Sequence, residues 1–428
     1  LYKHKTILFF IFLICMKLNP YKNVFICVYI IMKGHEFTEL SKSITKSIDN
    51  KTKKDEGIFF TPQSIINMTI ERVNKENPTI QTILEPSCGS GEFLNVIDRT
   101  YQNVDITGIE LNNTIFENIK NKTYEANQLT LINQDYLKWN SNKKFDLIIG
   151  NPPYFVMKKS DVDEIFHEFI DGRPNIFTLF IIHSLQFLET DGILAFVLPK
   201  NFVNCLYYSL LRHHIYEKYK IIDIIHCDAN LFMETAQDTI IFIIQNTTPP
   251  EDHNDQFTMN ASTTTLFNSI SNTRRIKELY EGSKTLSQLG FDVNVGTVVW
   301  NQVKDSLTDD KEQTRLIYSG DVKNNKLVQT QYKDPKKKNY IRKEGVNGLT
   351  MVLNRGYGKG KYIFSYAVVD MSGPYLIENH LINIRYNKDI SKKELMKKYK
   401  SLIKSFTDKR TTEFVELYFG NNAINTTE

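Results

Sequence analysis

Residues Ile83–Phe93 read ILEPSCGSGEF, an apolar run followed by a Gly-x-Gly turn and the start of an amphipathic segment. Glycine lets the backbone turn tightly and approach a ligand, and such turns bind nucleotide-like ligands in doubly wound sheets. On its own, Gly-x-Gly is equally typical of a helix entry without a ligand. The third glycine of the dinucleotide fingerprint is missing, however, and Glu85 precedes the turn. A carboxylate repels a pyrophosphate but attracts the sulfonium and ammonium groups of S-adenosylmethionine, so the stretch predicts a turn that binds this cofactor.

Short β-branched or apolar runs recur around this turn, and segments long enough for a helix separate most of them. This alternation predicts an α/β fold, a Rossmann-like, doubly wound and mostly parallel sheet of seven strands. Ahead of it, Glu36–Asn50 and Ile65–Val73 have helical periodicity, and Lys51–Gly57 is expected to be a charged turn. The expected strands are Thr79–Leu84, Asp105–Ile109, Thr130–Ile132, Phe145–Ile149, Ile193–Leu198, Ile221–His226 and Thr239–Ile244. The expected helices between them are Phe93–Arg99, Asn113–Lys120, Ile176–Glu189 and Tyr207–Lys218.

Two further acids follow the next two expected strands. Glu110 lies where a carboxylate can accept hydrogen bonds from both ribose hydroxyls of a nucleoside. Asp135 can accept a hydrogen bond from an adenine amino group, while Tyr136 packs against the ring. Helix capping would explain one acid at a strand end. Three acids at successive strand ends, counting Glu85, indicate a nucleoside pocket instead.

The strand expected at Phe145–Ile149 runs through Gly150 into Asn-Pro-Pro-Tyr, which alone is compatible with a rigid turn. The adenine amino nitrogen is a poor nucleophile because its lone pair is delocalised into the ring. If the Asn151 side-chain oxygen and the Pro152 carbonyl each accept one of its hydrogens, the lone pair is directed at the methyl group. Prolines hold these acceptors in place, and the tyrosine offers a stacking face to a flipped base. We therefore expect catalytic roles for Asn151, Pro152, Pro153 and Tyr154, with Asn151 also contacting the cofactor and Tyr154 the base.

From about residue 57 to the end, these stretches resemble the gamma-class (Taq-type) adenine-N6 DNA methyltransferases. Gly57–Pro62 resembles the family's N-terminal cofactor segment, which implies that Thr61 and Pro62 lie beside the methionine moiety. Glu85–Gly91 resembles the cofactor loop, and Asn230-Leu231-Phe232 resembles the segment whose aromatic ring, here Phe232, covers the other side of the flipped adenine. The cofactor-binding residues expected in all are Thr61, Pro62, Glu85, Ser87, Gly89, Gly91, Glu110, Asp135, Tyr136 and Asn151.

The alternation of strands and helices stops near Gln245, where a Thr-Thr-Pro-Pro stretch indicates a linker. We expect a cofactor-binding and catalytic domain at 33–246, a linker at 247–258 and a mixed α+β domain at 259–428. By resemblance the last of these is a target-recognition domain. Its expected strands are Val295–Trp300, Leu316–Tyr318, Thr350–Leu353, Tyr362–Val369 and Leu381–Tyr386. The resemblance there is carried by Val295–Gln302, Leu316–Val322, Leu353–Gly358 and Glu378–Leu381.

Residues 1–32 contain two apolar runs, Ile7–Met16 and Val24–Met32. Each is shorter than the roughly 20 residues that span a bilayer. Polar residues interrupt them and no small-residue cleavage site follows, so we expect a translated upstream extension, with the protein starting at Met16 or Met32, rather than a signal anchor. The cysteines show no CxxC pair or zinc-site spacing, which indicates a cytoplasmic protein without metal.

Positive charge is concentrated in the second half of the chain. Residues 251–428 contain 28 Lys and Arg against 21 Asp and Glu, whereas residues 1–250 contain 25 against 28. Residues 315–361 alone contain 12 basic and 3 acidic side chains. Such a stretch suits a phosphate backbone, although a solvated lysine-rich surface explains the charge equally well.

Other enzymes carry Asn-Pro-Pro-Tyr as well, among them those that methylate a glutamine amide of release factors and some that methylate RNA. The segment at Gly57–Pro62, Phe232 and the basic second half favour DNA. The intact motif argues against a catalytically dead homologue or a specificity subunit, and no PD…(D/E)xK arrangement indicates a fused nuclease. We expect a monomer that uses S-adenosylmethionine, binds duplex DNA on nucleoid or viral genomes, and needs no obligate protein partner. Any cognate restriction endonuclease would act separately.

Overall fold

The computed structural model describes residues 36–125, 127–228, 231–233, 237–261, 264–355, 364–419 and 424. The expected extension at 1–32, Asn230 and residues 356–358 lie outside the described residues. The chain divides into two compact units. Unit 1 runs up to Phe202 and continues over Leu210–Asn254, and unit 2 comprises Val203–Ser209 and the chain from Asp255 onward. Within the described part, no helix is long and apolar enough to cross a membrane.

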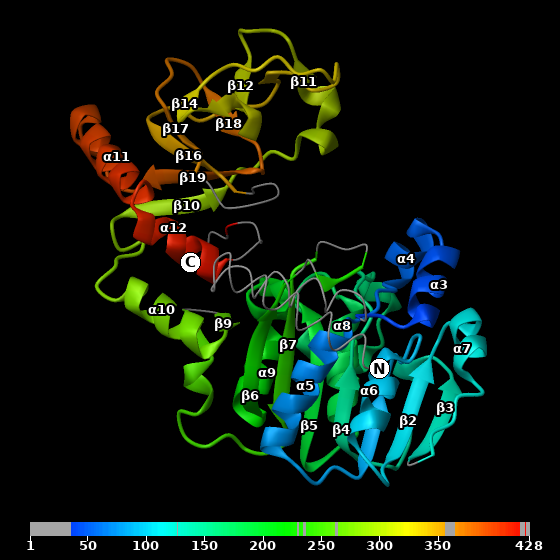
Figure 1. Cartoon of the computed structure of the whole chain (residues 1–428). Coiled ribbons are helices and arrows are strands. Elements are labelled where there is room, and N and C mark those ends of the chain that lie inside the picture. The colour runs from blue at the N-terminus through cyan, green and yellow to red at the C-terminus, as the bar shows by residue number, and fades with distance from the viewer. Residues whose placement is uncertain are drawn as a thin grey trace, which may run out of the picture. The chain divides into compact units, whose positions relative to one another are not determined.

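Unit 1 is built on one seven-stranded sheet with the strand order β3-β2-β1-β4-β5-β7-β6 (Figure 1). All neighbouring strands are parallel except that β7 runs antiparallel to both β5 and β6. The strands are β1 (Thr82–Glu85), β2 (Asp105–Glu110), β3 (Gln128–Asn133), β4 (Phe145–Gly150), β5 (Leu188–Pro199), β6 (Lys220–Cys227) and β7 (Thr239–Gln245). The predicted seven-stranded, mostly parallel α/β sheet is therefore confirmed.

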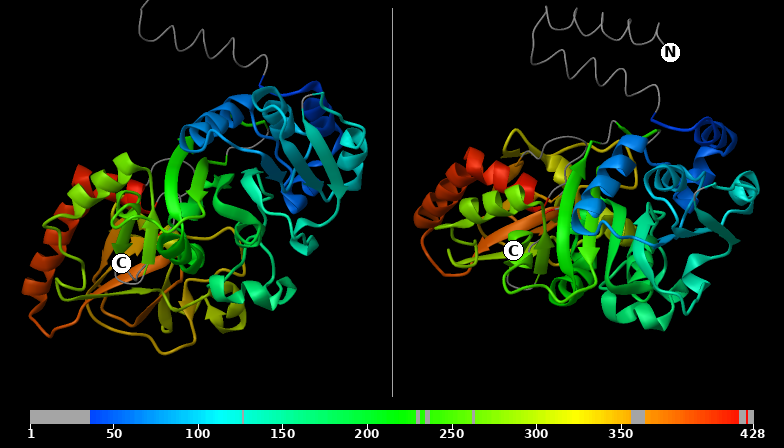
Figure 2. Two further views of the ribbon diagram at one scale, coloured as in Figure 1. Left: turned by 90° about the horizontal axis from the view of Figure 1, so that it is seen from below. Right: turned by 60° about the horizontal axis from the view of Figure 1, so that its bottom comes forward.

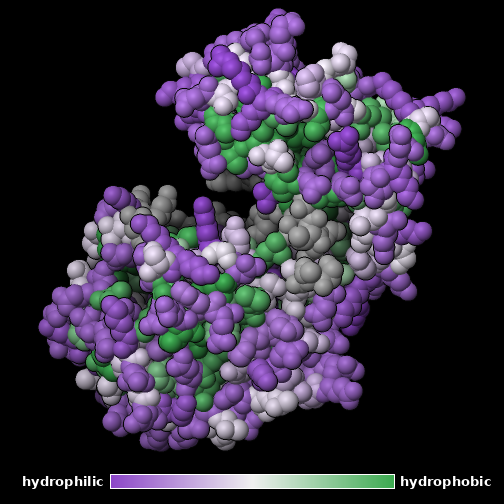
Figure 3. Space-filling view, turned by 180° about the vertical axis from the view of Figure 1, so that it is seen from behind, coloured by the Kyte–Doolittle hydropathy of each residue, from purple (hydrophilic) through white to green (hydrophobic). Residues whose placement is uncertain are grey.

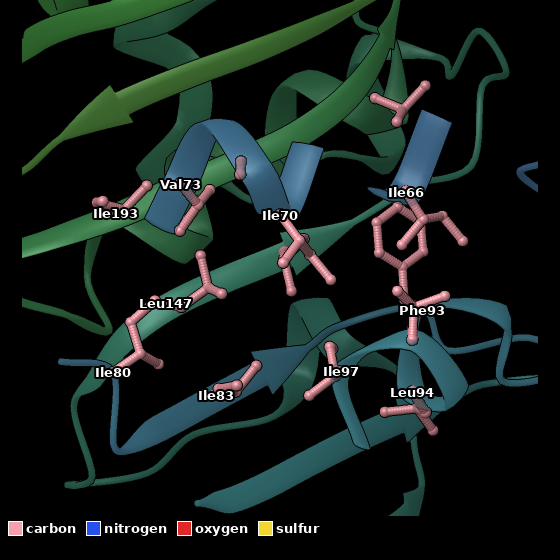
Figure 4. Packing of buried hydrophobic residues seen from close by; sticks show 14 of the residues in the cluster. Ile66, Ile70, Val73, Ile80, Ile83, Phe93, Leu94, Ile97, Leu147 and Ile193 are labelled. Atoms are coloured by element: carbon pink, nitrogen blue, oxygen red, sulfur yellow. The ribbon is translucent and has the colours of Figure 1, made fainter. Parts of the chain in front are cut away.

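Two helices, α5 (Gln63–Glu76) and α6 (Glu92–Thr100), cover one face of this sheet (Figure 4). Their buried side chains recur three or four residues apart, and those of the strands recur two apart, so one stripe of each helix meets one face of the sheet. The cluster includes Ile66, Ile70 and Val73 of α5, Phe93, Leu94 and Ile97 of α6, and Ile83, Leu147 and Ile193 of the strands.

The opposite face is covered by α8 (Ile176–Leu185). Phe196 and Phe242 are paired across β5 and β7 and are fully buried. Phe242 makes an edge-on ring contact with Phe202, which makes another with Phe177 of α8. Because α8 is buried along most of its length, apolar residues occur all round it instead of on one face. The remaining helices of the sheet region are α7 (Asn113–Ile119) and α9 (Ser209–Lys218).

Two short helices, α3 (Glu39–Ser47) and α4 (Asn50–Glu56), precede α5. The prediction of a charged turn at Lys51–Gly57 was therefore wrong. The Asp49 side chain accepts hydrogen bonds from the Lys51 and Thr52 backbone N–H groups, which caps the start of α4. Gly57, with φ of 67°, ends the helix in the left-handed conformation. Capping at both ends therefore stabilises a helix in a segment whose sequence has no apolar stripe.

Unit 2 is a mixed α+β unit, as predicted. Its main sheet is antiparallel, with the order β10-β19-β16-β17, and a second sheet has the order β11-β15-β12-β18. The helices α11 and α12 contribute Tyr399, Leu402 and Val415 to the core of the main sheet, and Figure 2 shows α11 beside these strands. On the face in Figure 3, hydrophilic residues cover most of the surface of each unit.

The longer elements of unit 2 are β10 (Phe291–Val295), β12 (Thr314–Ile317), β16 (Thr350–Asn354), β17 (Tyr366–Val369), β18 (Tyr375–Ile377), β19 (Leu381–Tyr386), α10 (Ile270–Tyr280), α11 (Lys392–Phe406) and α12 (Lys409–Tyr418). The shorter strands are β8 (Thr258–Ala261), β9 (Thr264–Phe267), β11 (Leu307–Thr308), β13 (Val322–Lys323), β14 (Lys326–Leu327) and β15 (Tyr340–Ile341). The strand predicted at Val295–Trp300 was wrong, because β10 ends at Val295. A Cβ on Gly296 would lie 2.2 Å from the Glu378 carbonyl oxygen, so only glycine fits where the chain leaves β10.

Candidate active site

A pocket of about 200 Å³ opens in unit 1 where β1, β2, β3 and β4 end. The carboxyl ends of parallel strands meet at one edge of a sheet, which is where ligands bind in this architecture. A fifth wall comes from the segment Glu56–Thr61. Of the residues expected from sequence at the cofactor site, Thr61, Ser87, Gly89, Glu110, Asp135, Tyr136 and Asn151 line this pocket. Pro62, Glu85 and Gly91 are not among the lining residues.

The Gly-x-Gly turn has the conformation that its glycines allow. Gly89 and Gly91 have φ of 49° and 83°, in the left-handed region that side chains with a Cβ rarely adopt. Gly91 is also the N-cap of α6, so it shapes the helix entry from behind the pocket wall. The Gly89 N–H donates a hydrogen bond of 2.8 Å to Glu110 Oε2, which joins the turn to the end of β2.

Glu110 faces the pocket with both carboxyl oxygens already bonded to backbone. Oε2 accepts from Gly89 and Oε1 accepts from the Asn112 N–H, each at 2.8 Å. Each oxygen keeps a further lone pair, so the carboxyl can still accept two hydroxyl groups. Burial raises the pKa of Glu110, although these two backbone hydrogen bonds act in the opposite direction.

Glu85 is 1% exposed and lies behind the pocket wall. Its Oε1 accepts a hydrogen bond from the Ser87 N–H at 3.3 Å, and its buried Oε2 has no hydrogen-bond partner. Burial raises the pKa of Glu85 well above its ordinary value of 4.5, and the nearby Glu110 carboxylate raises it further. An unpaired buried carboxyl oxygen is costly unless a donor or a cation reaches it. The lining of the pocket contains Glu56, Glu92, Glu110 and Asp135 and, among the described residues, no Lys, Arg or His, so it fits a ligand with a cationic group such as that of S-adenosylmethionine.

Asp135 and Tyr136 begin a 3-10 helix after β3. The Asp135 side chain accepts from the Leu137 N–H at 3.1 Å and caps this helix. Tyr136 is 2% exposed, and its hydroxyl is 2.8 Å from Ser184 Oγ within an aromatic group that includes Trp139 and Phe180. The ring predicted to pack against adenine is thus held mainly by the protein core.

The Asn-Pro-Pro-Tyr motif follows β4 and borders the pocket through Asn151 and Pro153. Asn151 Nδ2 donates to the Phe59 carbonyl at 3.0 Å, which leaves Oδ1 as a directed acceptor. The Tyr154 hydroxyl is 2.5 Å from that oxygen and 2.7 Å from the Val197 carbonyl oxygen. A hydroxyl has one hydrogen and donates it to one acceptor at a time. Burial raises the pKa of Tyr154, so it stays protonated and able to donate.

Phe232 packs in the core of unit 1. It is 8% exposed and belongs to the core cluster that also contains residues of α5 and α6. It is not among the residues lining the pocket. A role as the second stacking face therefore requires the ring to leave this packing.

Sequence reasoning missed several residues at the site. Phe59 and Phe60 were assigned to a cofactor segment only as neighbours of Thr61, yet the Phe59 carbonyl orients the Asn151 amide. Glu92, which directly precedes the predicted helix Phe93–Arg99, was given no role, but it lines the pocket and bonds to the start of α3. No short-range pattern signals either contact, because the partners are far apart in the chain.

Cys88 sits in the turn but is poorly suited to nucleophilic chemistry. It is 4% exposed, and burial raises the pKa of its thiol well above the ordinary value, so the reactive thiolate is disfavoured. A Cβ on Gly108 would lie 3.4 Å from its Sγ, which shows how closely β2 packs against it. Across the residues that the structure describes, no group of three or more His, Cys, Asp or Glu side chains could hold a metal ion.

Comparison with known proteins finds related chains. Residues 35–232 match the Eco57I restriction-modification methylase family. The Type II methyltransferase M.CvrRI of Paramecium bursaria Chlorella virus XZ-6E is 29% identical over 91% of this chain and 96% of its own length. The modification methylase CviBIII of Paramecium bursaria Chlorella virus NC1A is 31% identical, over 42% of this chain and 48% of its own length. Among solved structures, the type IIG restriction endonuclease BpuSI aligns with a TM-score of 0.44 and 11% identity, covering 90% of this chain and 60% of that one.

The sheet, the pocket and these relatives define an S-adenosylmethionine-dependent methyltransferase. The cofactor predicted from Ile83–Phe93 is thereby confirmed. The similarity to the Eco57I restriction-modification methylases extends over residues 35–232 of the 428.

Proposed function

We propose that this protein is a site-specific DNA methyltransferase that transfers a methyl group from S-adenosylmethionine to N6 of an adenine flipped out of duplex DNA. The observation that carries this proposal is the geometry of Asn151 at the pocket edge. Its amide is turned by the Phe59 carbonyl so that Oδ1 is available as an acceptor beside the pocket. The names of the relatives M.CvrRI and CviBIII, a Type II methyltransferase and a modification methylase, support the reaction class.

In this proposal, Asn151 Oδ1 and the Pro152 carbonyl each accept one hydrogen of the adenine amino group. The Tyr154 hydroxyl, which now lies within reach of both Asn151 Oδ1 and the Val197 carbonyl, donates to Val197 once the base arrives. The amino group therefore replaces one hydrogen bond to Oδ1 with another, which keeps the exchange inexpensive in free energy. Pro153 keeps the loop rigid, and the Tyr154 ring stacks on the base.

S-adenosylmethionine, when bound, supplies an electrophilic methyl group that N6 attacks directly. Glu110 would hold the ribose hydroxyls and Asp135 the adenine amino group, while Glu85 offsets the positive charge of the cofactor. Thr61, Pro62, Ser87, Gly89, Gly91 and Tyr136 shape the same site. No covalent enzyme intermediate is needed, in keeping with the buried, protonated Cys88.

Unit 2 would supply target recognition, with the basic side chains of 315–361 other than the buried Arg315 facing phosphates and duplex DNA as the partner. A monomer would suffice, and any cognate restriction endonuclease would act as a separate protein. Phe232 would complete the stacking on the flipped adenine after moving out of the core. Steep loss of DNA affinity with rising salt is expected if these lysines and arginines neutralise phosphates.

The test is labelled methyl transfer to unmethylated plasmid DNA, with a release factor and RNA as parallel acceptors. Transfer to DNA with the label in N6-methyladenine is the expected result. Preference for the release factor or RNA would assign the same chemistry to a glutamine amide or an RNA base instead. Asn151→Ala should abolish transfer while cofactor affinity stays near that of the wild type, and retained transfer would contradict the assigned acceptor.

A further inference from the structure

The pocket has a wall that comes from outside the sheet. We define the N-terminal arm as residues 36–61, which contain α3, α4 and the segment that reaches the pocket at Glu56–Thr61. Three contacts join this arm to the loops around the pocket. The Phe59 carbonyl accepts from Asn151, Glu56 Oε2 accepts from Asn112 Nδ2 at 3.0 Å, and the Thr38–Ser41 turn bonds to Glu92.

The third contact is the most buried of the three. Glu92 follows Gly91 in the first turn of α6, is 4% exposed and lines the pocket. Its Oε1 accepts from the Thr38 N–H at 2.8 Å, from Thr38 Oγ1 at 2.9 Å and from Ser41 Oγ. Ser90 Oγ lies 2.6 Å from Ser41 Oγ, so the hydroxyl of the turn joins the same network. One carboxyl oxygen thus gathers three donors from the start of α3.

A charged group in this place has two possible uses. It can attract the cationic cofactor from the pocket wall, or it can hold the arm against the cofactor loop. All three donors on Oε1 belong to the arm, and Oε2 faces the Gln63 side-chain amide at 3.5 Å. The hydrogen bonds of Glu92 are therefore directed at the arm and at α5 rather than into the pocket.

We propose that Glu92 is a positioning residue that holds the N-terminal arm on the cofactor loop and thereby sets the Phe59 carbonyl against the Asn151 amide. The arm closes the pocket only while its first turn is anchored, since α3 and α4 are short helices that need tertiary contacts to stay in place. Loss of the anchor weakens cofactor binding and loosens the acceptor that the reaction needs. The inference rests on the proposed function in taking the pocket as the S-adenosylmethionine site.

A close approach at the other end of the arm supports this coupling. Gly57 has φ of 67°, and a Cβ there would lie 2.6 Å from the Tyr154 backbone nitrogen. The arm and the Asn-Pro-Pro-Tyr loop are therefore in backbone contact with no side chain between them. A displacement of the arm is transmitted to this loop directly.

The experiment compares Glu92→Ala, Glu92→Gln and Ser41→Ala in the full chain, with Glu117→Ala, a substitution on the exposed side of α7, as the control. Limited trypsin digestion reports cleavage within the arm, where Lys46 and Lys51 are exposed. Calorimetry with S-adenosylhomocysteine reports cofactor-site affinity. Glu92→Ala should speed cleavage and weaken binding about ten-fold or more, because the arm loses three hydrogen bonds to a carboxyl group.

Ser41→Ala should also speed cleavage and weaken binding, but by less, because Glu92 keeps its hydrogen bonds from Thr38. Glu92→Gln, which keeps an acceptor oxygen for the arm, should restore both towards the wild type. Binding lost in Glu92→Gln as fully as in Glu92→Ala, with the arm still protected, would instead show a direct charge contact with the ligand and overturn the proposal. Unchanged cleavage in Glu92→Ala would overturn it as well. If the wild-type protein binds no S-adenosylhomocysteine, the proposed cofactor site itself is wrong. The trypsin experiment needs no ligand and tests the Glu92 contact with the arm independently.

Discussion

Glu110 offers the sharpest test of the cofactor site, and Glu110→Gln is the informative change. The carboxyl accepts Gly89 N–H and Asn112 N–H at 2.8 Å, one on each oxygen, and offers both remaining lone pairs to the ribose. A carboxamide has one acceptor oxygen, and its NH₂ group would face a backbone N–H. The variant therefore loses a hydrogen bond to a charged acceptor on the ligand side, worth about 1.5–3 kcal/mol, or about 10- to 150-fold in Kd.

The pH dependence of this loss has a definite sign. Burial raises the pKa of Glu110 above 4.5, so a protonated fraction persists above that pH in the free protein. Ribose hydroxyls donate to the ionised form, and wild-type affinity therefore rises as pH rises through the raised pKa. Below it, the protonated carboxyl also has a single good acceptor, and the difference between wild type and Glu110→Gln should shrink.

Calorimetric titration with S-adenosylhomocysteine across this pH range measures both effects. Glu117→Gln, a substitution on the exposed side of α7 beside Lys120, is the matched control and should bind as the wild type does. A Glu110→Gln protein that binds as tightly as wild type at every pH would show that the carboxyl does not contact the ligand. The ribose assignment would then fail.

Three further outcomes are expected. Glu85→Gln should raise the melting temperature of the free protein at alkaline pH but not near pH 4.5. Because the folded protein raises the pKa of Glu85, the wild type loses stability as pH rises through that raised pKa, and glutamine does not ionise. Equal melting curves for the two proteins would contradict this. Tyr154→Phe keeps the ring but loses the hydroxyl that donates to the Val197 carbonyl while the base occupies Asn151 Oδ1, so methyl transfer should fall about ten-fold at unchanged cofactor affinity; an unchanged rate would show that this hydroxyl does not contribute. Asp321→Asn leaves Arg315 without its buried ionic partner at 2.8 Å and should destabilise unit 2 by about 3–5 kcal/mol in chemical denaturation; a shift below about 1 kcal/mol would refute that.

The strands of unit 1 were predictable because their signal is local. A buried parallel strand needs a short run of β-branched or apolar residues, as in Phe145–Gly150, and each such run is complete within a few residues. The strands of unit 2 were harder to predict from sequence. Strands such as β13 and β15 contain two residues each, and they exist because of their partners rather than their own sequence. The helix α4 was missed because its caps, not its periodicity, create it.

The sequence by itself determined the turn at Ile83–Phe93, the acids at the strand ends and the Asn-Pro-Pro-Tyr loop, because turn conformation and strand ends depend on neighbours along the chain. Tertiary structure alone decided how these pieces meet. It placed the Phe59 carbonyl on the Asn151 amide, 92 positions away, and Thr38 on Glu92, 54 positions away. It also buried Tyr136, predicted to pack against the cofactor's adenine, and Phe232, to which the family resemblance gave a place beside the flipped base. Contacts of this kind depend on packing between distant segments, and no local pattern records them.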